Sequence, residues 1–155
     1  MTGRVRLALW LYGAAGVVYA VDRLTKVLAE RHLQGRPPVR LIPPVLQLRF
    51  TENPGGAFGL FGGQPWLFFA ATVGVCLLIV ALSTRQVSRG AAVAMGLVLG
   101  GALGNLTDRI IRGPGMSGQV VDFIDLRVWP VFNLADSAIV IGGILLLLSG
   151  LRHRG

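Results

Sequence analysis

The residues best suited to chemistry in this chain are aspartates at the ends of long apolar runs. Asp136 lies a few residues into the last run and is followed by fifteen residues without a charge. An ionised carboxylate in such a place needs a partner or a proton. A second carboxylate nearby would raise one pKa and lower the other, as in aspartic proteases. Spacing alone leaves Asp108, Asp122 and Asp125 open as the partner of Asp136.

Other polar residues gather at the same boundary between apolar and polar sequence. Asp22 and Lys26 are four residues apart and therefore share one face of a helix. We predict that this face turns inward. Ionisable groups at membrane depth are functional candidates by default. The alternative is a cap network, in which Asp and Asn cap helix ends and Arg reaches the headgroups.

The elements that must position these residues are four apolar segments. The chain has 155 residues, of which 53% are hydrophobic and 14% charged, and its composition excludes a disordered chain, a collagen and a coiled coil. About 20 apolar residues span a bilayer as a helix. We predict transmembrane helices at about 7–29, 65–82, 90–107 and 131–151. The expected fold is an all-α polytopic membrane protein with a small extracytoplasmic β-rich segment.

The charge distribution predicts the orientation in the membrane. The net charge is +8, from 15 basic and seven acidic residues. One side would hold six arginines and no acid, namely Arg4, Arg6, Arg85, Arg89, Arg152 and Arg154. The other side would hold nine basic residues and all the acids, so the positive-inside rule places both termini in the cytoplasm. Topology thus explains the basic charge, and we expect no nucleic-acid partner.

Two outer segments, about 30–64 and 108–130, complete one membrane-embedded domain over 1–155. Val39–Ile42 and Val45–Thr51 predict two short strands, the second from its alternating polarity. Gly113-Pro114-Gly115 predicts a flexible loop. Arg4, Arg6 and the following apolar stretch also resemble a cleavable signal peptide. We rank that reading lower because the first helix carries the Asp22 face.

Five motifs, in order along nearly the whole chain, resemble the lipoprotein signal peptidase (signal peptidase II) family, bacterial inner-membrane aspartic proteases. They are Asp22-Arg23-Leu24-Thr25-Lys26, Glu52-Asn53-Pro54-Gly55-Gly56-Ala57-Phe58-Gly59, Gly104-Asn105-Leu106-Thr107-Asp108-Arg109, Val120-Val121-Asp122-Phe123-Ile124 and Phe132-Asn133-Leu134-Ala135-Asp136-Ser137. The family's fold has four transmembrane helices, cytoplasmic termini and an extracytoplasmic β-rich cradle. The stretch from Asp108 to Asp122 is longer than the family's usual spacing, which leaves the 110–121 loop open.

The resemblance implies an activity and a set of site residues. The catalytic pair would be Asp122 and Asp136, acting near the outer leaflet without a metal or an organic cofactor. Residues that hold the substrate or support the pair would be Asp22, Lys26, Asn53, Asn105, Asp108, Arg109 and Asn133. The substrate would be a diacylglyceryl-modified prolipoprotein, cut before the lipidated cysteine, and we expect a monomer in contact with membrane lipid. The outer segment Asn53–Phe61 would help to admit the lipid.

Two other functions fit the composition. A small channel or transporter would use the polar cluster as an ion pathway, but the cytoplasmic halves of the helices are apolar. A non-enzymatic scaffold would not need paired acids.

Overall fold

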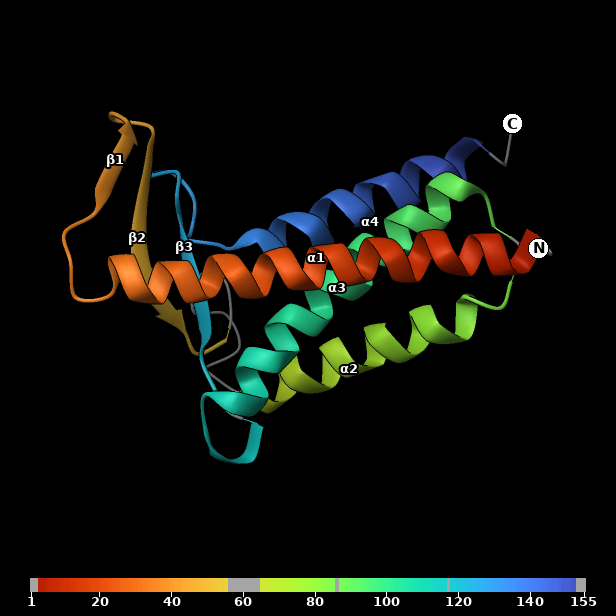
Figure 1. Ribbon diagram of the computed structural model, residues 1–155, viewed down its shortest axis with the longest axis horizontal. Coiled ribbons are helices and arrows are strands. Elements are labelled where there is room, and N and C mark those ends of the chain that lie inside the picture. Colours follow the sequence, from red (N-terminus) through yellow and green to blue (C-terminus); the bar gives the residue numbers. More distant parts are fainter. Residues whose placement is uncertain (1–2, 56–64, 86, 117, 153–155) are drawn as a thin grey trace.

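The computed structural model of the chain describes residues 3–55, 65–85, 87–116 and 118–152. The described residues form four α-helices and a three-stranded antiparallel sheet. The sheet lies at one end of the helices, whereas the two ends of the chain and the α2–α3 connection lie at the other (Figure 1). The helices are α1 (Gly3–Leu33), α2 (Pro65–Leu82), α3 (Arg89–Ile111) and α4 (Leu134–Arg152), and the strands are β1 (Val39–Ile42), β2 (Leu46–Asn53) and β3 (Val120–Asp125).

Helix α3 forms the centre of the helical part because small residues let its neighbours approach closely. A Cβ atom added at Gly100 would lie 2.5 Å from the carbonyl oxygen of Ala15 on α1. On another face, a Cβ at Gly101 would lie 2.5 Å from the carbonyl oxygen of Ala135 on α4. The glycines of α3 therefore fix the distance from α3 to both α1 and α4.

We expect Gly100→Ala to destabilise the protein, because the clashing atom belongs to the backbone of α1 and no rotamer change relieves it. Overpacking of this kind costs about 1–3 kcal/mol. Gly16→Ala is the control, since a Cβ at Gly16 meets nothing within 4 Å and alanine favours a helix by up to about 1 kcal/mol. Thermal unfolding in detergent measures both variants. Equal shifts in Tm would show that the α1–α3 contact is not close-packed.

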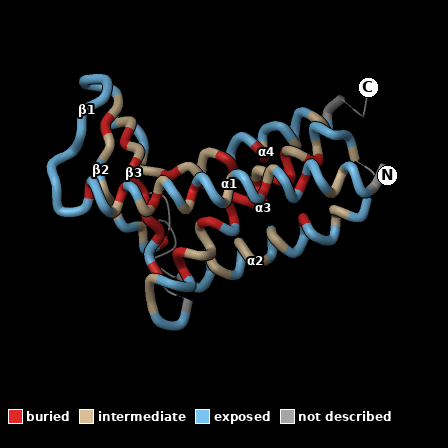
Figure 2. Tube along the Cα trace, viewed as in Figure 1, coloured by how far each residue is buried: buried red, intermediate tan, exposed pale blue. Residues whose placement is uncertain are grey.

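Apolar side chains cover the outer surface of the helices. Exposed residues lie along the outer faces of α1, α2 and α4, and buried ones along α3 (Figure 2). Two of the described helices, Val5–Leu33 and Arg89–Ile111, are long and apolar enough to cross a membrane, whereas Trp66–Leu82 and Leu134–Gly150 are apolar but shorter. Large apolar residues on an outer surface suit a lipid environment better than water.

The sheet has the order β1-β2-β3, and each neighbouring pair is antiparallel. Strand β1 has the predicted bounds, and β2 begins one residue later than predicted and continues to Asn53. The prediction of two strands was incomplete, because Val120–Asp125 is a third strand. Five of its six residues are buried, so the strand lacks the alternation of polarity by which an exposed sheet is recognised.

Three helices differ in length from the predicted segments. Helix α1 starts at Gly3 and runs on to Leu33, and α3 continues to Ile111. Asp108 and Arg109 therefore belong to α3 and not to the outer segment that was expected to begin at 108. Helix α4 starts at Leu134, later than predicted, because Phe132, two residues earlier, pairs with Ile124 in an isolated bridge beside the sheet.

The connection from α3 to β3 folds back onto the end of the helix. Pro114–Met116 forms a short 3₁₀ turn in which Gly115 has φ +62°. The N–H of Gly118 donates to the carbonyl oxygen of Arg109 at 3.1 Å, and a Cβ at Gly118 would lie 2.6 Å from the Asp108 carbonyl oxygen. The glycine thus allows β3 to start directly beside α3, which brings β3 to the polar residues of that helix.

Candidate active site

Asp122 and Asp136 come from different elements, and both carboxylates are bonded to one residue, Asn133. Asp122 lies on β3, and Asp136 lies in the first turn of α4. The Asn133 Nδ2 donates to Asp122 Oδ1 at 2.7 Å, and the Asn133 backbone N–H donates to Asp136 Oδ2 at 3.2 Å. Asn133 is fully buried, so its contacts with the two carboxylates are fixed in position.

The sequence Asn-Leu-Ala-Asp orients Asp136 through a reciprocal helix cap. Asn133 precedes α4, and its Oδ1 accepts from the backbone N–H of Asp136 at 2.9 Å. Asp136 in turn accepts from the N–H of Asn133, which completes a capping box. The second oxygen of Asp136 accepts from Asn105 Nδ2 at 2.8 Å. Both oxygens of Asp136 are thereby directed by neutral donors.

Asp122 is held only by neutral amides among the described residues. Besides Asn133, Asn53 Nδ2 donates to its Oδ2 at 3.0 Å, and the residue is 1% exposed. Burial, together with the nearby charge of Asp136, raises the pKa of Asp122 to about 7. A carboxyl group with such a pKa exchanges its proton near neutral pH, as acid–base catalysis requires.

The other two candidate partners of Asp136 are ion-paired. Asp125 accepts from Gln47 at 2.7 Å, from Arg49 at 2.8 Å and from the backbone N–H of Arg127 at 2.8 Å. Burial opposes its ionisation, but these hydrogen bonds hold the pKa of Asp125 below its usual value. Asp108 is bonded to three cations, as described next. Of the three acids, Asp122 is thus the one without a described cationic partner.

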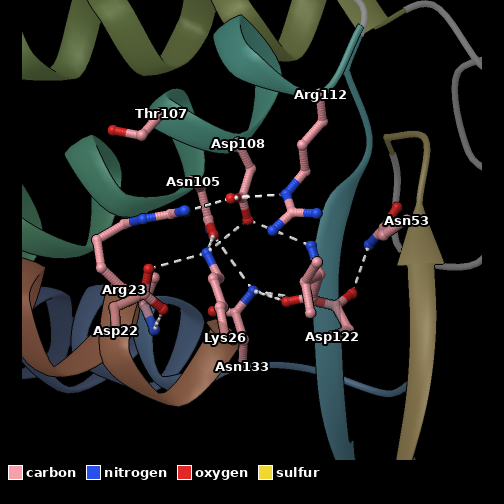
Figure 3. Close-up of polar contacts among 12 residues, drawn as sticks. Asp22, Arg23, Lys26, Asn53, Asn105, Thr107, Asp108, Arg112, Asp122 and Asn133 are labelled. Atoms are coloured by element: carbon pink, nitrogen blue, oxygen red, sulfur yellow. Dashed lines mark hydrogen bonds and ion pairs between the residues drawn. The ribbon is translucent and has the colours of Figure 1, made fainter. Parts of the chain in front are cut away.

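The single lysine of the chain lies at the centre of a buried ionic network (Figure 3). Lys26 Nζ is 2.9 Å from Asp22 Oδ2 and 3.1 Å from Asp108 Oδ2, and it donates to Asn105 Oδ1 at 2.9 Å. The side chains of Lys26, Asp22 and Asp108 are fully buried. Buried charges of this kind require such pairing.

This network also holds the two segments that carry the aspartates. Asp22 Oδ1 accepts from the backbone N–H of Ala135 at 3.1 Å, one residue before Asp136. Asp108 Oδ2 accepts from the backbone N–H of Val121 at 3.3 Å, one residue before Asp122. Lys26 therefore links the two backbone segments that carry the candidate catalytic residues. It does so through Asp22, which holds the backbone before Asp136, and through Asp108, which holds the backbone before Asp122.

Arg109 brings an unused donor to the same region. The residue is 7% exposed, and its guanidinium carbon lies 5.7 Å from the ring centroid of Phe68. Its Nη1 has no hydrogen-bond partner within the described part of the chain. The carboxylates of Asp122 and Asp136 both attract the positive charge of the Arg109 guanidinium. Nη1 is buried, and a Cβ added at Gly55 would lie only 3.5 Å from it, so a larger residue at this position would crowd the donor.

Eight of the nine predicted site residues form one continuous set of hydrogen bonds and ion pairs in the structure. These are Asp22, Lys26, Asn53, Asn105, Asp108, Asp122, Asn133 and Asp136. Arg109 lies beside this set, and within the described residues no hydrogen bond or ion pair joins it to the other eight. At the end of β2, Asn53 Oδ1 accepts from the backbone N–H of Gly55 at 2.9 Å. Ala57, Phe58, Leu60 and Phe61 lie outside the described residues.

Three charged residues of the network were not predicted. Arg23 donates to Asp108 Oδ1, Arg112 Nε donates to the same oxygen at 3.0 Å, and Arg112 also pairs with Glu30. Arg112 follows Asp108 by four residues, a helical spacing that favours an ion pair. The ion pair between Asp108 and Arg112 was not predicted from this spacing, because the helix was expected to end at about residue 107.

Comparison with known proteins places this arrangement in a class. The sequence model of the Signal peptidase (SPase) II family matches residues 14–152. A lipoprotein signal peptidase of Rhodococcus jostii is 49% identical over 140 residues, which cover 90% of this chain and 71% of the relative. One of Desulfitobacterium hafniense is 40% identical over 153 residues, or 96% of each chain.

Solved structures agree with this result. One bacterial membrane enzyme, determined by the in meso method at 2.3 Å resolution, has a TM-score of 0.80 at 30% identity and covers 92% of this chain and 87% of its own. A second, at 1.9 Å resolution, has a TM-score of 0.76 at 31% identity and covers 89% and 90%. The protein is thus an integral membrane protease of bacteria. It belongs to the signal peptidase II family and has the function of a membrane signal peptidase. The protein therefore functions as a signal peptidase, and not as the channel or the non-enzymatic scaffold that its composition also allowed.

Proposed function

We propose that the chain is an aspartic endopeptidase in which Asp122 and Asp136 carry out catalysis. The observation that supports this most strongly is the shared contact with Asn133, which holds two carboxyl groups from separate elements at one place. Neither carboxylate has an ion-pairing partner among the described residues, so neither is committed to a structural salt bridge.

The chemistry requires that the pair share one proton. The ionised carboxylate takes a proton from a water molecule, whose oxygen attacks the scissile carbonyl carbon. The protonated carboxyl donates its proton to the carbonyl oxygen, and the tetrahedral intermediate then collapses with proton transfer to the leaving amine. The two apparent pKa values belong to the pair as a whole.

The proposed substrate is a prolipoprotein with a diacylglyceryl-modified cysteine, cut before that cysteine. In this proposal all four helices span the membrane, both termini are cytoplasmic, and the catalytic pair is near the outer leaflet. The arginine-rich ends of the helices and the acid-rich sheet end, at opposite ends of the molecule, support this orientation. A lipid-anchored scissile bond would reach the pair at that depth.

The supporting residues divide into two roles in this proposal. Arg109 Nη1 and the amide of Asn53 lie beside the pair and are placed to bind the substrate backbone. Asp22, Lys26, Asn105 and Asp108 position the elements that carry the catalytic residues. The outer segment Asn53–Phe61 would form part of the wall that admits the lipid, with its glycines allowing close backbone approach.

We expect cleavage to depend strongly on the lipid. Purified protein in detergent should cleave a peptide whose cysteine carries the diacylglyceryl thioether much faster than the same peptide with a free thiol. Each buried CH₂ group contributes about 0.8 kcal/mol, so even part of two acyl chains would dominate substrate binding. The measured quantity is kcat/KM for the two peptides, with mass spectrometry locating the cut.

Comparable kcat/KM values for the two peptides would contradict the proposed substrate. Phe58→Ala and Phe61→Ala test the outer segment separately. A lipid preference that survives both changes would remove this segment from lipid selection while leaving the preference itself in place.

The pH profile tests the shared proton. We expect kcat/KM to fall as the pH rises through about 7, because the second carboxyl, with the raised pKa of Asp122, then ionises and the proton donor is lost. At acidic pH the remaining carboxylate is protonated and the base is lost, so the profile is bell-shaped. Tm measured over the same range separates loss of chemistry from unfolding. A constant kcat/KM well above neutral pH, in folded protein, would exclude this pair.

A further inference from the structure

A groove lies at the end of the helices that is remote from the catalytic pair. It has a volume of about 780 Å³ and is formed by α1, α3 and α4 near the α2–α3 connection. Its volume is in the range of small-molecule sites, about 300–1,000 Å³. None of the residues proposed for catalysis lines it.

The groove is apolar along most of its length. Trp10 from α1, Val93 from α3, and Leu145 and Leu148 from α4 form these walls. Trp10 is 50% exposed and Leu148 is 52% exposed, so the described residues leave much of both apolar side chains uncovered. Such a surface fits a hydrocarbon chain that lies along the helices.

The polar part of the groove carries positive charge. Ser88 and Arg89, at the start of α3, line it together with Ser149. Arg89 makes no ion pair with any described residue. No Asp or Glu occurs in 1–21, 83–107 or 137–155, so no acidic side chain from these segments can pair with Arg89. The first turn of a helix adds a partial positive charge at the same place.

We propose that this groove binds an anionic phospholipid from the leaflet at the termini of the chain. The phosphate group would lie against Arg89 and the Ser88 hydroxyl, and one acyl chain would lie along Trp10 and Leu148. Charge complementarity selects this occupant, because a basic site with no acidic neighbour favours a net negative headgroup over a zwitterionic one. This site is separate from the peptidase site, and its test does not depend on the proposed catalytic chemistry.

Native mass spectrometry of the whole protein in a neutral detergent measures the binding. The probes are phosphatidylglycerol and phosphatidylcholine with identical acyl chains. We expect phosphatidylglycerol to bind about tenfold more tightly, as a hydrogen-bonded charge pair would produce. Arg89→Gln should remove this preference. Gly90→Leu should weaken both lipids, because Gly90 lines the groove and a Cβ added there meets no atom nearer than Ser88 Oγ at 4.0 Å.

Matched controls separate this site from general attraction to a basic surface. Arg85→Gln removes a nearby arginine that does not line the groove, and Gly150→Leu adds a side chain to α4 where a Cβ meets nothing within 4 Å. Both should bind the two lipids as the unaltered protein does.

Equal affinity of the unaltered protein for the two lipids would overturn the proposal, as would equal losses in Arg85→Gln and Arg89→Gln. A dimer mass that disappears in Gly90→Leu would instead assign the groove to a second copy of the chain. If Arg89→Gln failed to fold, the comparison of the two lipids and the Gly90→Leu variant would still decide the matter.

Discussion

Replacement of Asp122 or Asp136 by asparagine is expected to reduce kcat at least about 100-fold, since acid–base groups contribute roughly 10²–10⁴-fold. An amide has nearly the shape of the carboxyl group but can neither take a proton from water nor donate one as an acid. The two changes should have similar effects because the reaction needs both members of the pair. The assay is single-turnover cleavage of the lipidated peptide, with Tm showing that each variant is folded.

Asp125→Asn is the matched control for this prediction. Asp125 lies on the same strand as Asp122, is also buried, and is bonded to Gln47 and Arg49. If the role of Asp122 were to hold the sheet together, Asp125→Asn would reduce turnover as much as Asp122→Asn. We expect it to keep most of the turnover. Either catalytic variant retaining more than about a tenth of the rate would contradict the shared-proton mechanism.

Much of the fold could be predicted because the helices are apolar throughout. Helix α2 has the predicted bounds, Pro65–Leu82, since both ends coincide with a change in hydropathy. The outer end of α3 could not be found in this way. Asn105, Asp108 and Arg112 are polar, but their side chains bond to α1, β3 and α4. A polar stretch that faces other protein elements has the composition of a loop and the structure of a helix.

The candidate site was predictable in part. The motifs were sufficient to name the residues, but spacing could not choose the partner of Asp136. That choice depends on which acids are neutralised by cations, and those cations come from distant positions. Arg49 pairs with Asp125 across the sheet, and Lys26 and Arg23 pair with Asp108 across two helices. Only the pairing of β2 with β3 and of α1 with α3 identifies Asp122 as the unpaired acid.

Lys26→Met is expected to cause the largest loss of stability among single substitutions in the network. It removes the cation between two buried carboxylates while keeping most of the volume of the side chain. Breaking a buried ion pair costs about 3–5 kcal/mol, because the remaining charge has no compensation. Asp108 retains Arg23 and Arg112, whereas Asp22 has no other ion pair among the described residues. The loss should therefore arise mainly at Asp22.

A second substitution distinguishes this cause from a loss of packing. Asp22→Asn removes the unpaired charge and keeps an oxygen that can accept from the Ala135 N–H, so Lys26→Met combined with Asp22→Asn should be more stable than Lys26→Met alone. Arg31→Met, on the exposed side of the same helix, is the control and should leave Tm nearly unchanged. If the double variant were no more stable than Lys26→Met, the lysine would act through its volume. If it regained stability but not turnover, Lys26 would be required to set the distance between the backbones before Asp122 and Asp136.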